Sequence, residues 1–208
     1  MSENLFTEYQ YTDSNPTWSN NYLWGPLQDV FSQYPDLTRK IFEIGCGSGA
    51  TAKHLSDLGF DVTGIDPSKS GIELANSAFP ELKLLQNSAY DDLARQYGKF
   101  PFVVSLEVIE HSFYPRKFVD TLYELLEDQG VGIISTPYHG YWKNLALAIT
   151  GKLDAHFTVL WDGGHIKFFS EKTLRYLLEE AGFQKISFVR VGRVPPLAKS
   201  LIAIVQKS

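Results

Sequence analysis

The chain has a single cysteine, Cys46, among its 208 residues, so no disulfide can form within it. This scarcity is typical of a reducing compartment, and we expect a cytoplasmic location. Basic residues are too few to give a positive surface: the formal net charge is −5, which argues against broad nucleic-acid binding. The first ten residues, MSENLFTEYQ, lack the basic and apolar regions of a signal peptide. No apolar run approaches the roughly 20 residues that a membrane span requires.

The composition is that of a globular protein with one core. Hydrophobic residues make up 44% and charged residues 21% of the sequence. We expect a single domain over residues 1–208, because this length can bury one core. Residues 1–36 are interpreted as an N-terminal arm followed by a helix. Residues 138–168 are interpreted as an aromatic-rich lid insertion over an acceptor site.

Strand-like apolar runs alternate with helix-like segments along most of the chain. Strands are expected at 40–44, 60–66, 82–87, 100–108, 130–137, 185–192 and 200–206. Helices are expected at 22–34, 50–58, 68–79, 115–126 and 170–181. Serial β-then-α units predict a parallel sheet covered on both faces, because parallel strands need crossover connections. Only a short loop with Pro195 and Pro196 separates the last two strands, so the final strand should run antiparallel.

The expected fold class is therefore α/β. It is a Rossmann-like three-layer sandwich with a seven-stranded, mostly parallel sheet whose last strand is antiparallel. Ligands of open α/β sheets bind at the carboxyl ends of the strands, and the most glycine-rich loop of the sequence lies there.

That loop, GCGSGA at residues 45–50, follows the first strand and precedes a helix. It satisfies the G-x-G-x-x-G/A fingerprint of nucleotide-binding turns, although a tight strand-to-helix turn without a ligand gives the same letters. Asp66 ends the second strand, where a carboxylate can accept both hydroxyls of a ribose. The sequence Asp66-Pro67-Ser68 is also the pattern of a turn and a helix cap.

Three features favour S-adenosylmethionine over a nicotinamide dinucleotide. Glu43 lies two residues before Gly45, where a carboxylate complements an ammonium or sulfonium and repels a pyrophosphate. The chain supplies one nucleotide-binding half, whereas a dinucleotide enzyme generally needs a second half or a substrate domain. The antiparallel last strand does not belong to the dehydrogenase pattern. An NAD(P)-dependent oxidoreductase and a non-catalytic cofactor-binding module of the same fold are the alternatives.

Four segments, EIGCGSG, GIDPS, VVSLEVIEH and GVGIISTP, resemble in this order the motifs of class I S-adenosylmethionine-dependent methyltransferases. The resemblance runs from about residue 37 to the C-terminus. Within the class, SLEVIEH and GGHIKFFSEKTLRYLLEEAGF are most similar to ubiquinone-biosynthesis O-methyltransferases and to methyltransferases acting on sugars or polyketides. The resemblance implies methyl transfer to a small-molecule acceptor, which is a quinone precursor, a sugar or a polyketide. The expected acceptor group is a hydroxyl, methylated by in-line displacement with a histidine as the base.

The resemblance also implies cofactor contacts at the carboxyl ends of the strands. The methionine part would be lined by Glu43, Gly45, Cys46, Gly47 and Gly49. The ribose would be held by Asp66 and Pro67, the adenine by Asn87, Ser88 and Ala89, and the ammonium by main-chain carbonyls of Ser105 and Leu106. In much of the family an aspartate meets the adenine, whereas this chain has QNSAYDD at that point.

An oxygen acceptor must lose a proton, which favours a base with a pKa near neutrality, and histidine fits this requirement. His111 follows the fourth strand at the mouth of the cofactor site and is the first candidate. A hydrogen bond that orders the loop is its alternative role. His139 follows the fifth strand and His165 precedes the last helix, so both could border the acceptor pocket.

Glu107, Glu110 and His111 form an E-x-x-E-H cluster. In the ubiquinone-type relatives this motif is associated with a divalent metal such as Mg²⁺, and carboxylate oxygens suit a hard cation. The same pattern occurs in metal-free methyltransferases, where the second glutamate orients the histidine.

The segment YWKNLALAITGKL, at residues 141–153, is amphipathic. We expect it to form a lid or pocket wall, and peripheral membrane contact is the alternative. The sequence gives no prediction of the oligomeric state.

Overall fold

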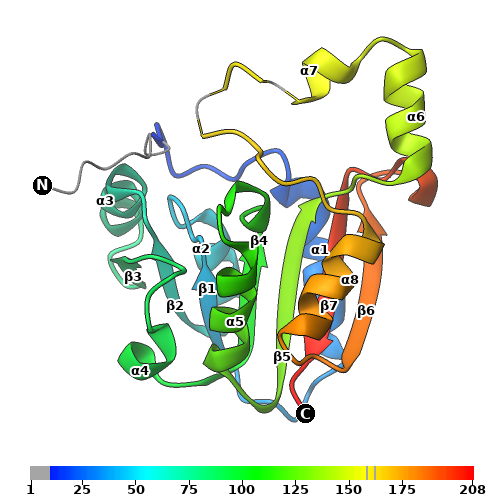
Figure 1. Cartoon of the computed structure of the whole chain (residues 1–208). Helices are drawn as coiled ribbons and strands as arrows, with labels where there is room; N and C mark the ends of the chain where they lie inside the picture. Colours follow the sequence, from blue (N-terminus) through cyan, green and yellow to red (C-terminus); the bar gives the residue numbers. More distant parts are fainter. Residues whose placement is uncertain (1–9, 158, 162) are drawn as a thin grey trace, which may run out of the picture.

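The computed structural model describes residues 10–157, 159–161 and 163–208. Its centre is a seven-stranded sheet with the strand order β3-β2-β1-β4-β5-β7-β6 (Figure 1). The strands are β1 (Lys40–Ile44), β2 (Asp61–Asp66), β3 (Lys83–Gln86), β4 (Phe100–Leu106), β5 (Leu126–Pro137), β6 (Lys185–Val191) and β7 (Ser200–Gln206). The pairings among β1 to β5 are parallel, and β7 pairs antiparallel with both β5 and β6. The predicted α/β sandwich with its antiparallel last strand is confirmed.

Helices cover both faces of the sheet. They are α1 (Asn20–Ser32), α2 (Ala50–Asp57), α3 (Lys69–Ala78), α4 (Leu93–Tyr97), α5 (Pro115–Leu125), α6 (Tyr141–Ile149), α7 (Leu153–Phe157) and α8 (Glu171–Glu180), with 3₁₀ turns η1 (Ile109–His111) and η2 (Pro195–Leu197). Buried residues of α1, α2 and α3 form one core cluster, and those of α4, α5 and α8 form the other. The short α4 was not expected. Helices α6 and α7 lie in the stretch 138–168, where no helix was predicted, and α6 falls within the amphipathic segment 141–153.

Local signals in the sequence set several of these boundaries. Ser68 caps α3, since its Oγ accepts the backbone N–H of Gly71 at 3.1 Å. Ser170 and Thr173 form a reciprocal capping box at the start of α8. Four of the five residues of β1 are buried, as expected for a parallel strand with helices on both faces.

The insertion at residues 138–168 lies above the carboxyl ends of the strands (Figure 1). Two backbone hydrogen bonds fix its far end, because the amides of Ile166 and Lys167 both donate to the carbonyl of Glu110 at 2.9 Å. Neither α6 nor α7 contributes a fully buried residue. Within the described residues, no helix combines the length and apolar character needed to cross a membrane.

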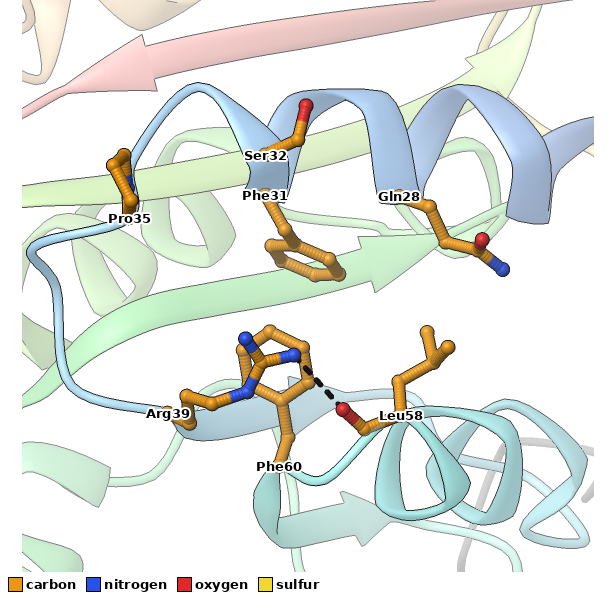
Figure 2. Close-up of a pocket in the computed structure, with 7 residues that line it drawn as sticks. All are labelled: Gln28, Phe31, Ser32, Pro35, Arg39, Leu58 and Phe60. Carbon is orange, nitrogen blue, oxygen red and sulfur yellow. Dashed lines mark hydrogen bonds between the residues drawn. The ribbon is translucent and has the colours of Figure 1, made fainter.

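A pocket of about 240 Å³ opens at the opposite end of the strands, where β1 begins (Figure 2). Arg39 lies in it, with Nη2 donating to the carbonyl of Leu58 at 2.8 Å and the guanidinium 4.4 Å above the ring of Phe60. Because β1 runs from this pocket toward the glycine loop, the pocket lies away from the candidate site.

Candidate functional site

The glycine loop bends tightly over the end of β2. The amides of Gly45 and Cys46 both donate to the carbonyl of Ile65, at 2.8 and 2.9 Å. Gly45, Gly47 and Gly49 have φ of 82°, 51° and 86°, a region that other L-residues rarely adopt. The glycines therefore shape the backbone that a cofactor would approach. Cys46 is buried and its thiol pKa is raised well above the usual value, first by burial, so it acts as a packing group.

Asp66 joins this loop to the start of α3. Its carboxylate is buried and accepts the amides of Gly47 at 2.9 Å and Ser68 at 2.8 Å. The turn-and-cap role expected of Asp66-Pro67-Ser68 is thus present in the fold. The same carboxylate lies beside the glycine loop, which is the position that the ribose assignment requires.

Glu43 is a buried carboxylate with an unsatisfied oxygen. Its side chain lies in β1, the residue is 2% exposed, and its Oε2 has no hydrogen-bond partner among the described residues. Burial, followed by the nearby charge of Asp66, raises the pKa of Glu43 to about 8. Because a buried carboxylate is costly unless a cation or donors accompany it, this position fits a cofactor that carries a sulfonium and an ammonium.

The other expected cofactor residues lie around this loop. The Oγ of Ser105 donates to the carbonyl of Ile44 at 2.8 Å, which ties β4 to the end of β1. Leu106 is the last residue of β4. The amide of Asn87 donates to the carbonyl of Asp66 at 3.1 Å, so the segment from Asn87 to Ala89 begins beside the ribose candidate. The roles of these residues toward the cofactor stay predictions.

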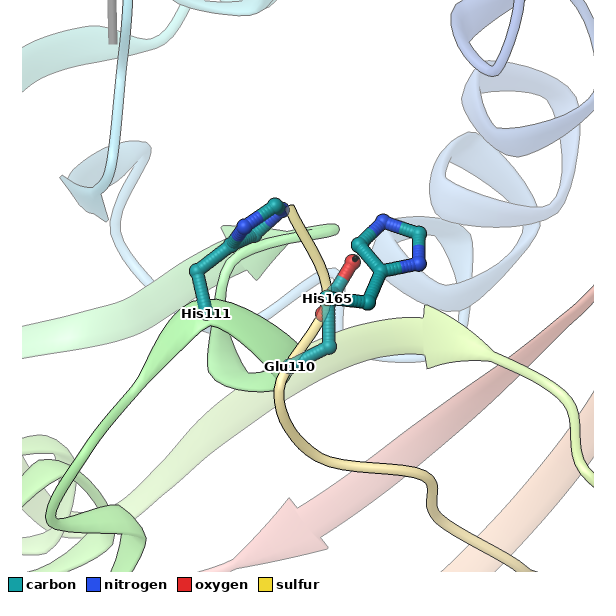
Figure 3. A group of neighbouring side chains, drawn as sticks. All are labelled: Glu110, His111 and His165. Carbon is teal, nitrogen blue, oxygen red and sulfur yellow. Dashed lines mark ion pairs between the residues drawn. The ribbon is translucent and has the colours of Figure 1, made fainter. Parts of the chain in front are cut away.

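Glu110, His111 and His165 gather where η1 meets the end of the insertion (Figure 3). One ligand atom from each of the three lies within 4.8 Å of the others. The Nε2 of His165 is 3.9 Å from Oε1 of Glu110. The backbone bonds from residues 166 and 167 to Glu110 bring His165 to this place.

His111 is held in one tautomer by a backbone carbonyl. Its Nδ1–H donates to the carbonyl oxygen of Gly163 at 2.8 Å, which leaves the Nε2 lone pair available. Burial lowers the pKa of His111 below its usual value of 6.5. The imidazole is therefore neutral at pH 7 and competent to accept a proton or bind a cation.

Glu110 is fully buried beneath the two imidazoles. Among the described residues, neither carboxylate oxygen has a hydrogen bond of ordinary geometry, although the Thr136 hydroxyl and the Glu110 amide lie close enough to oppose the rise in its pKa. Burial, followed by the proximity of Glu107, raises the pKa of Glu110 well above its usual value. A buried acidic side chain with so few donors is typical of a site that binds something further.

Glu107 is hydrogen-bonded to residues outside this group, although its charge is close enough to affect Glu110. Its carboxylate accepts the hydroxyls of Ser135 at 2.7 Å and Ser200 at 3.1 Å, and its φ of 56° is unusual for a non-glycine residue. Burial raises the pKa of Glu107 to about 7, and the two serine bonds oppose this rise. The hydroxyl of Tyr22 lies 3.1 Å from Oγ of Ser200. The E-x-x-E-H cluster is thus divided, and His165 joins Glu110 and His111 in place of Glu107.

His139 lies in a separate aromatic group. Its ring centroid is 5.9 Å from that of Phe157, 5.0 Å from that of Phe168 and 5.4 Å from that of His156. Burial, followed by Lys143 and His156, lowers the pKa of His139 to about 4. Burial also lowers the pKa of His165 to about 4, so both side chains are neutral at pH 7.

Sequence comparison assigns the family. A family model described as "Methyltransferase domain" matches residues 19–187, and this chain therefore belongs to that family. The ubiquinone biosynthesis O-methyltransferase of Bartonella quintana is 31% identical over 175 residues, which cover 81% of this chain and 69% of that protein. The enzyme of the same name from Cereibacter sphaeroides is 29% identical over 166 residues, which cover 76% of this chain and 66% of that protein. The chain spans about two thirds of the length of these curated relatives.

Solved structures share the fold. An S-adenosylmethionine-dependent methyltransferase from Archaeoglobus fulgidus aligns with a TM-score of 0.64 and 14% identity, covering 88% of this chain and 92% of that chain. An O-methyltransferase family protein from Burkholderia thailandensis aligns with a TM-score of 0.67 and 14% identity, covering 89% of this chain and 56% of that chain. These structures show the shared fold, and the family match with the curated relatives identifies this chain as an S-adenosylmethionine-dependent methyltransferase.

Proposed function

We propose that this enzyme methylates a hydroxyl of a small molecule bound between the glycine loop and the insertion. The observation that carries the proposal is the position of His111. Val108, three residues earlier, packs over Gly45 so closely that a Cβ on that glycine would overlap its side chain. The turn that carries His111, a neutral imidazole with its proton on Nδ1, therefore begins beside the loop that would hold the methyl donor.

In the proposed reaction, Nε2 of His111 accepts the proton of the acceptor hydroxyl while the oxygen attacks the methyl carbon of the sulfonium. The new bond is C–O and the broken bond is C–S, whose electron pair stays on sulfur. The products are a methyl ether, S-adenosylhomocysteine and one proton, which leaves through His111. Most of the acceleration would come from holding the three atoms in line, and the base adds to it.

The acceptor we favour is a phenolic quinone precursor. The two relatives are named for ubiquinone biosynthesis, which supports this choice over a sugar or a polyketide. In the described part of the insertion, Trp161 lies beside His111, while Phe157 and Phe168 lie beside His139, and aromatic walls suit a flat ring. A phenol also needs less help from a base than a sugar hydroxyl does, because its pKa is about 10.

A divalent cation held by Glu110, His111 and His165 is a second candidate role for this group. The buried carboxylate, whose oxygens lack hydrogen bonds of ordinary geometry, and the two neutral imidazoles favour it. Two nitrogens and one carboxylate suit Mn²⁺, Fe²⁺ or Zn²⁺ better than Mg²⁺, which prefers oxygen. Such a cation would bind the acceptor oxygen and lower its pKa, and His111 would then be a ligand.

Assay of the purified protein with S-adenosylmethionine and a series of catechols, phenols and sugars tests the proposal. O-methylated product from a phenolic acceptor, detected by mass spectrometry, supports it. Binding of S-adenosylhomocysteine without methylation of any acceptor supports the non-catalytic module instead. Hydride transfer to NAD in place of methyl transfer would support the oxidoreductase.

Two expectations from the sequence stay predictions. The side chains of Tyr141, Trp142 and Ile149 are 73%, 64% and 76% exposed, which is compatible with either a lid surface or membrane contact. Sedimentation with anionic vesicles distinguishes the two. The cytoplasmic location is to be tested by fractionation of the source cell.

A further inference from the structure

Tyr11 packs directly on the glycine loop from a segment that the motifs do not include. A Cβ placed on Gly47 would lie 2.6 Å from the Tyr11 hydroxyl oxygen and 2.8 Å from its Cζ. A Cβ on Gly71, in the first turn of α3, would lie 2.9 Å from Cδ2 of the same ring. The ring therefore fills the space that two glycines leave open, on the loop and on the neighbouring helix.

The segment of residues 11–20, here called the N-terminal strap, is attached on both sides of the loop. At one end, the amide of Tyr11 donates to Oγ of Ser70 at 3.3 Å, in the first turn of α3. At the other end, Nδ2 of Asn20 donates to Oγ1 of Thr51 at 3.0 Å, in the first turn of α2. Figure 1 shows this segment running across the edge of the sheet where the strands end. The strap thus crosses the loop between its two flanking helices.

The Tyr11 ring also lies close to the residues expected to hold the ribose. Gly47, which the ring contacts, donates its amide to Oδ2 of Asp66 at 2.9 Å. Ser70, which accepts the amide of Tyr11, lies 3.0 Å from Ser68 through their hydroxyls, and Ser68 donates its amide to Oδ1 of Asp66. Gly47 is thus one hydrogen bond from the Asp66 carboxylate, and Ser70 is two hydrogen bonds from it through Ser68.

We propose that Tyr11 is a cofactor-binding residue and that the strap closes over S-adenosylmethionine bound at the glycine loop. This inference rests on the proposed placement of the cofactor at Gly47 and Asp66. The ring would cover the bound ligand from the solvent side and add contact area, while the anchor at Asn20 keeps the strap in register. Cofactor exchange would then require the Tyr11 end of the strap to lift.

Three variants measured by calorimetric titration with S-adenosylhomocysteine test the inference. Tyr11→Ala removes the ring and should weaken binding roughly five- to tenfold. Tyr11→Phe keeps the ring and should stay close to wild type. Trp18→Ala is the matched control, because Trp18 belongs to the same strap, is 75% exposed and contacts Lys199 rather than the loop. Equal affinities for Tyr11→Ala and Trp18→Ala would overturn the proposal.

Hydrogen exchange of the wild-type protein gives a readout that needs no variant. Amides of residues 10–20 should exchange more slowly when S-adenosylhomocysteine is bound. Exchange that is unchanged or faster would mean that the ligand does not use the strap or displaces it. Loss of binding in Asp66→Ala, measured in parallel, shows separately whether the cofactor lies at this loop. The experiments therefore distinguish an error in the role of the strap from an error in the placement of the cofactor at this loop.

Discussion

His111 donates its Nδ1–H to the carbonyl oxygen of Gly163 at 2.8 Å, across 52 residues of sequence. This bond orders the last part of the insertion and at the same time selects the tautomer of the histidine. Because the proton is on Nδ1, the Nε2 lone pair is free for an acceptor hydroxyl or a cation. One interaction thus links the insertion to the candidate base.

Replacing His111 with alanine should lower turnover roughly 10²–10⁴-fold, because the acceptor would lose its base. The affinity for S-adenosylhomocysteine should stay close to that of wild type. His54→Ala is a suitable control, since His54 stacks on Trp24 at 4.0 Å and lies outside the site. Steady-state kinetics with the best acceptor gives the comparison. Normal turnover of His111→Ala would move the base to His139 or His165.

Replacing Glu43 with glutamine should stabilise the ligand-free protein at alkaline pH and weaken cofactor binding. The folded-state pKa of Glu43 is about 8, above its ordinary value of 4.5, so folding favours the protonated form. That contribution to stability is full below the unfolded pKa and is lost as pH rises toward the folded pKa.

As the pH is raised from 5 to 8, the thermal midpoint of wild type should therefore decrease relative to that of Glu43→Gln. The decrease should be about 2–4 °C for each kcal/mol of stability lost. Calorimetric scans of both proteins over that range measure it. A constant difference between the two midpoints would show that Glu43 does not titrate in this window.

Replacing Asp66 with alanine should weaken S-adenosylhomocysteine binding by about 1–3 kcal/mol, because a ligand hydroxyl and two backbone amides lose their acceptor. Asp66→Asn keeps one carbonyl oxygen and should lose less. Calorimetric titration of both variants separates the roles. If Asp66→Ala binds as tightly as wild type, the ribose assignment is wrong and Asp66 serves only the turn and the cap.

Removing bound divalent cations with a chelator tests the second role of Glu110, His111 and His165. If a cation takes part, activity should be lost and then restored by Mn²⁺, Fe²⁺ or Zn²⁺. His165→Ala and Glu110→Gln should both lower the affinity for the metal ion that restores activity, whereas His139→Ala should not. Full activity in the chelated protein would leave His111 as a base without a metal.

The residues that could be assigned from the sequence are those with local signals. Short sequence stretches predict the glycine loop, the Ser68 cap and the antiparallel β7, and the structure has all three. The approach of His165 to Glu110 depends on backbone hydrogen bonds from residues 166 and 167 to residue 110. No local sequence pattern predicts these bonds.

Two further contacts depend on the same kind of long-range assembly. In the turn after β4, Glu107 has a φ of 56° and is hydrogen-bonded to Ser135 and Ser200, so it is not one of the three ligand candidates, although Glu110 and His111 are close to it in sequence. Tyr11 meets Gly47 and Gly71 through an arm without periodicity. In each case, the contact is made between segments that only the complete sheet brings together.

The most direct test of the central claim is a methyl-transfer assay with S-adenosylmethionine labelled on its methyl group and a phenolic acceptor. The account predicts a product in which the label is on the phenol oxygen, formed by wild type and strongly reduced in His111→Ala. A label on carbon or nitrogen, or equal product from the two proteins, would contradict it.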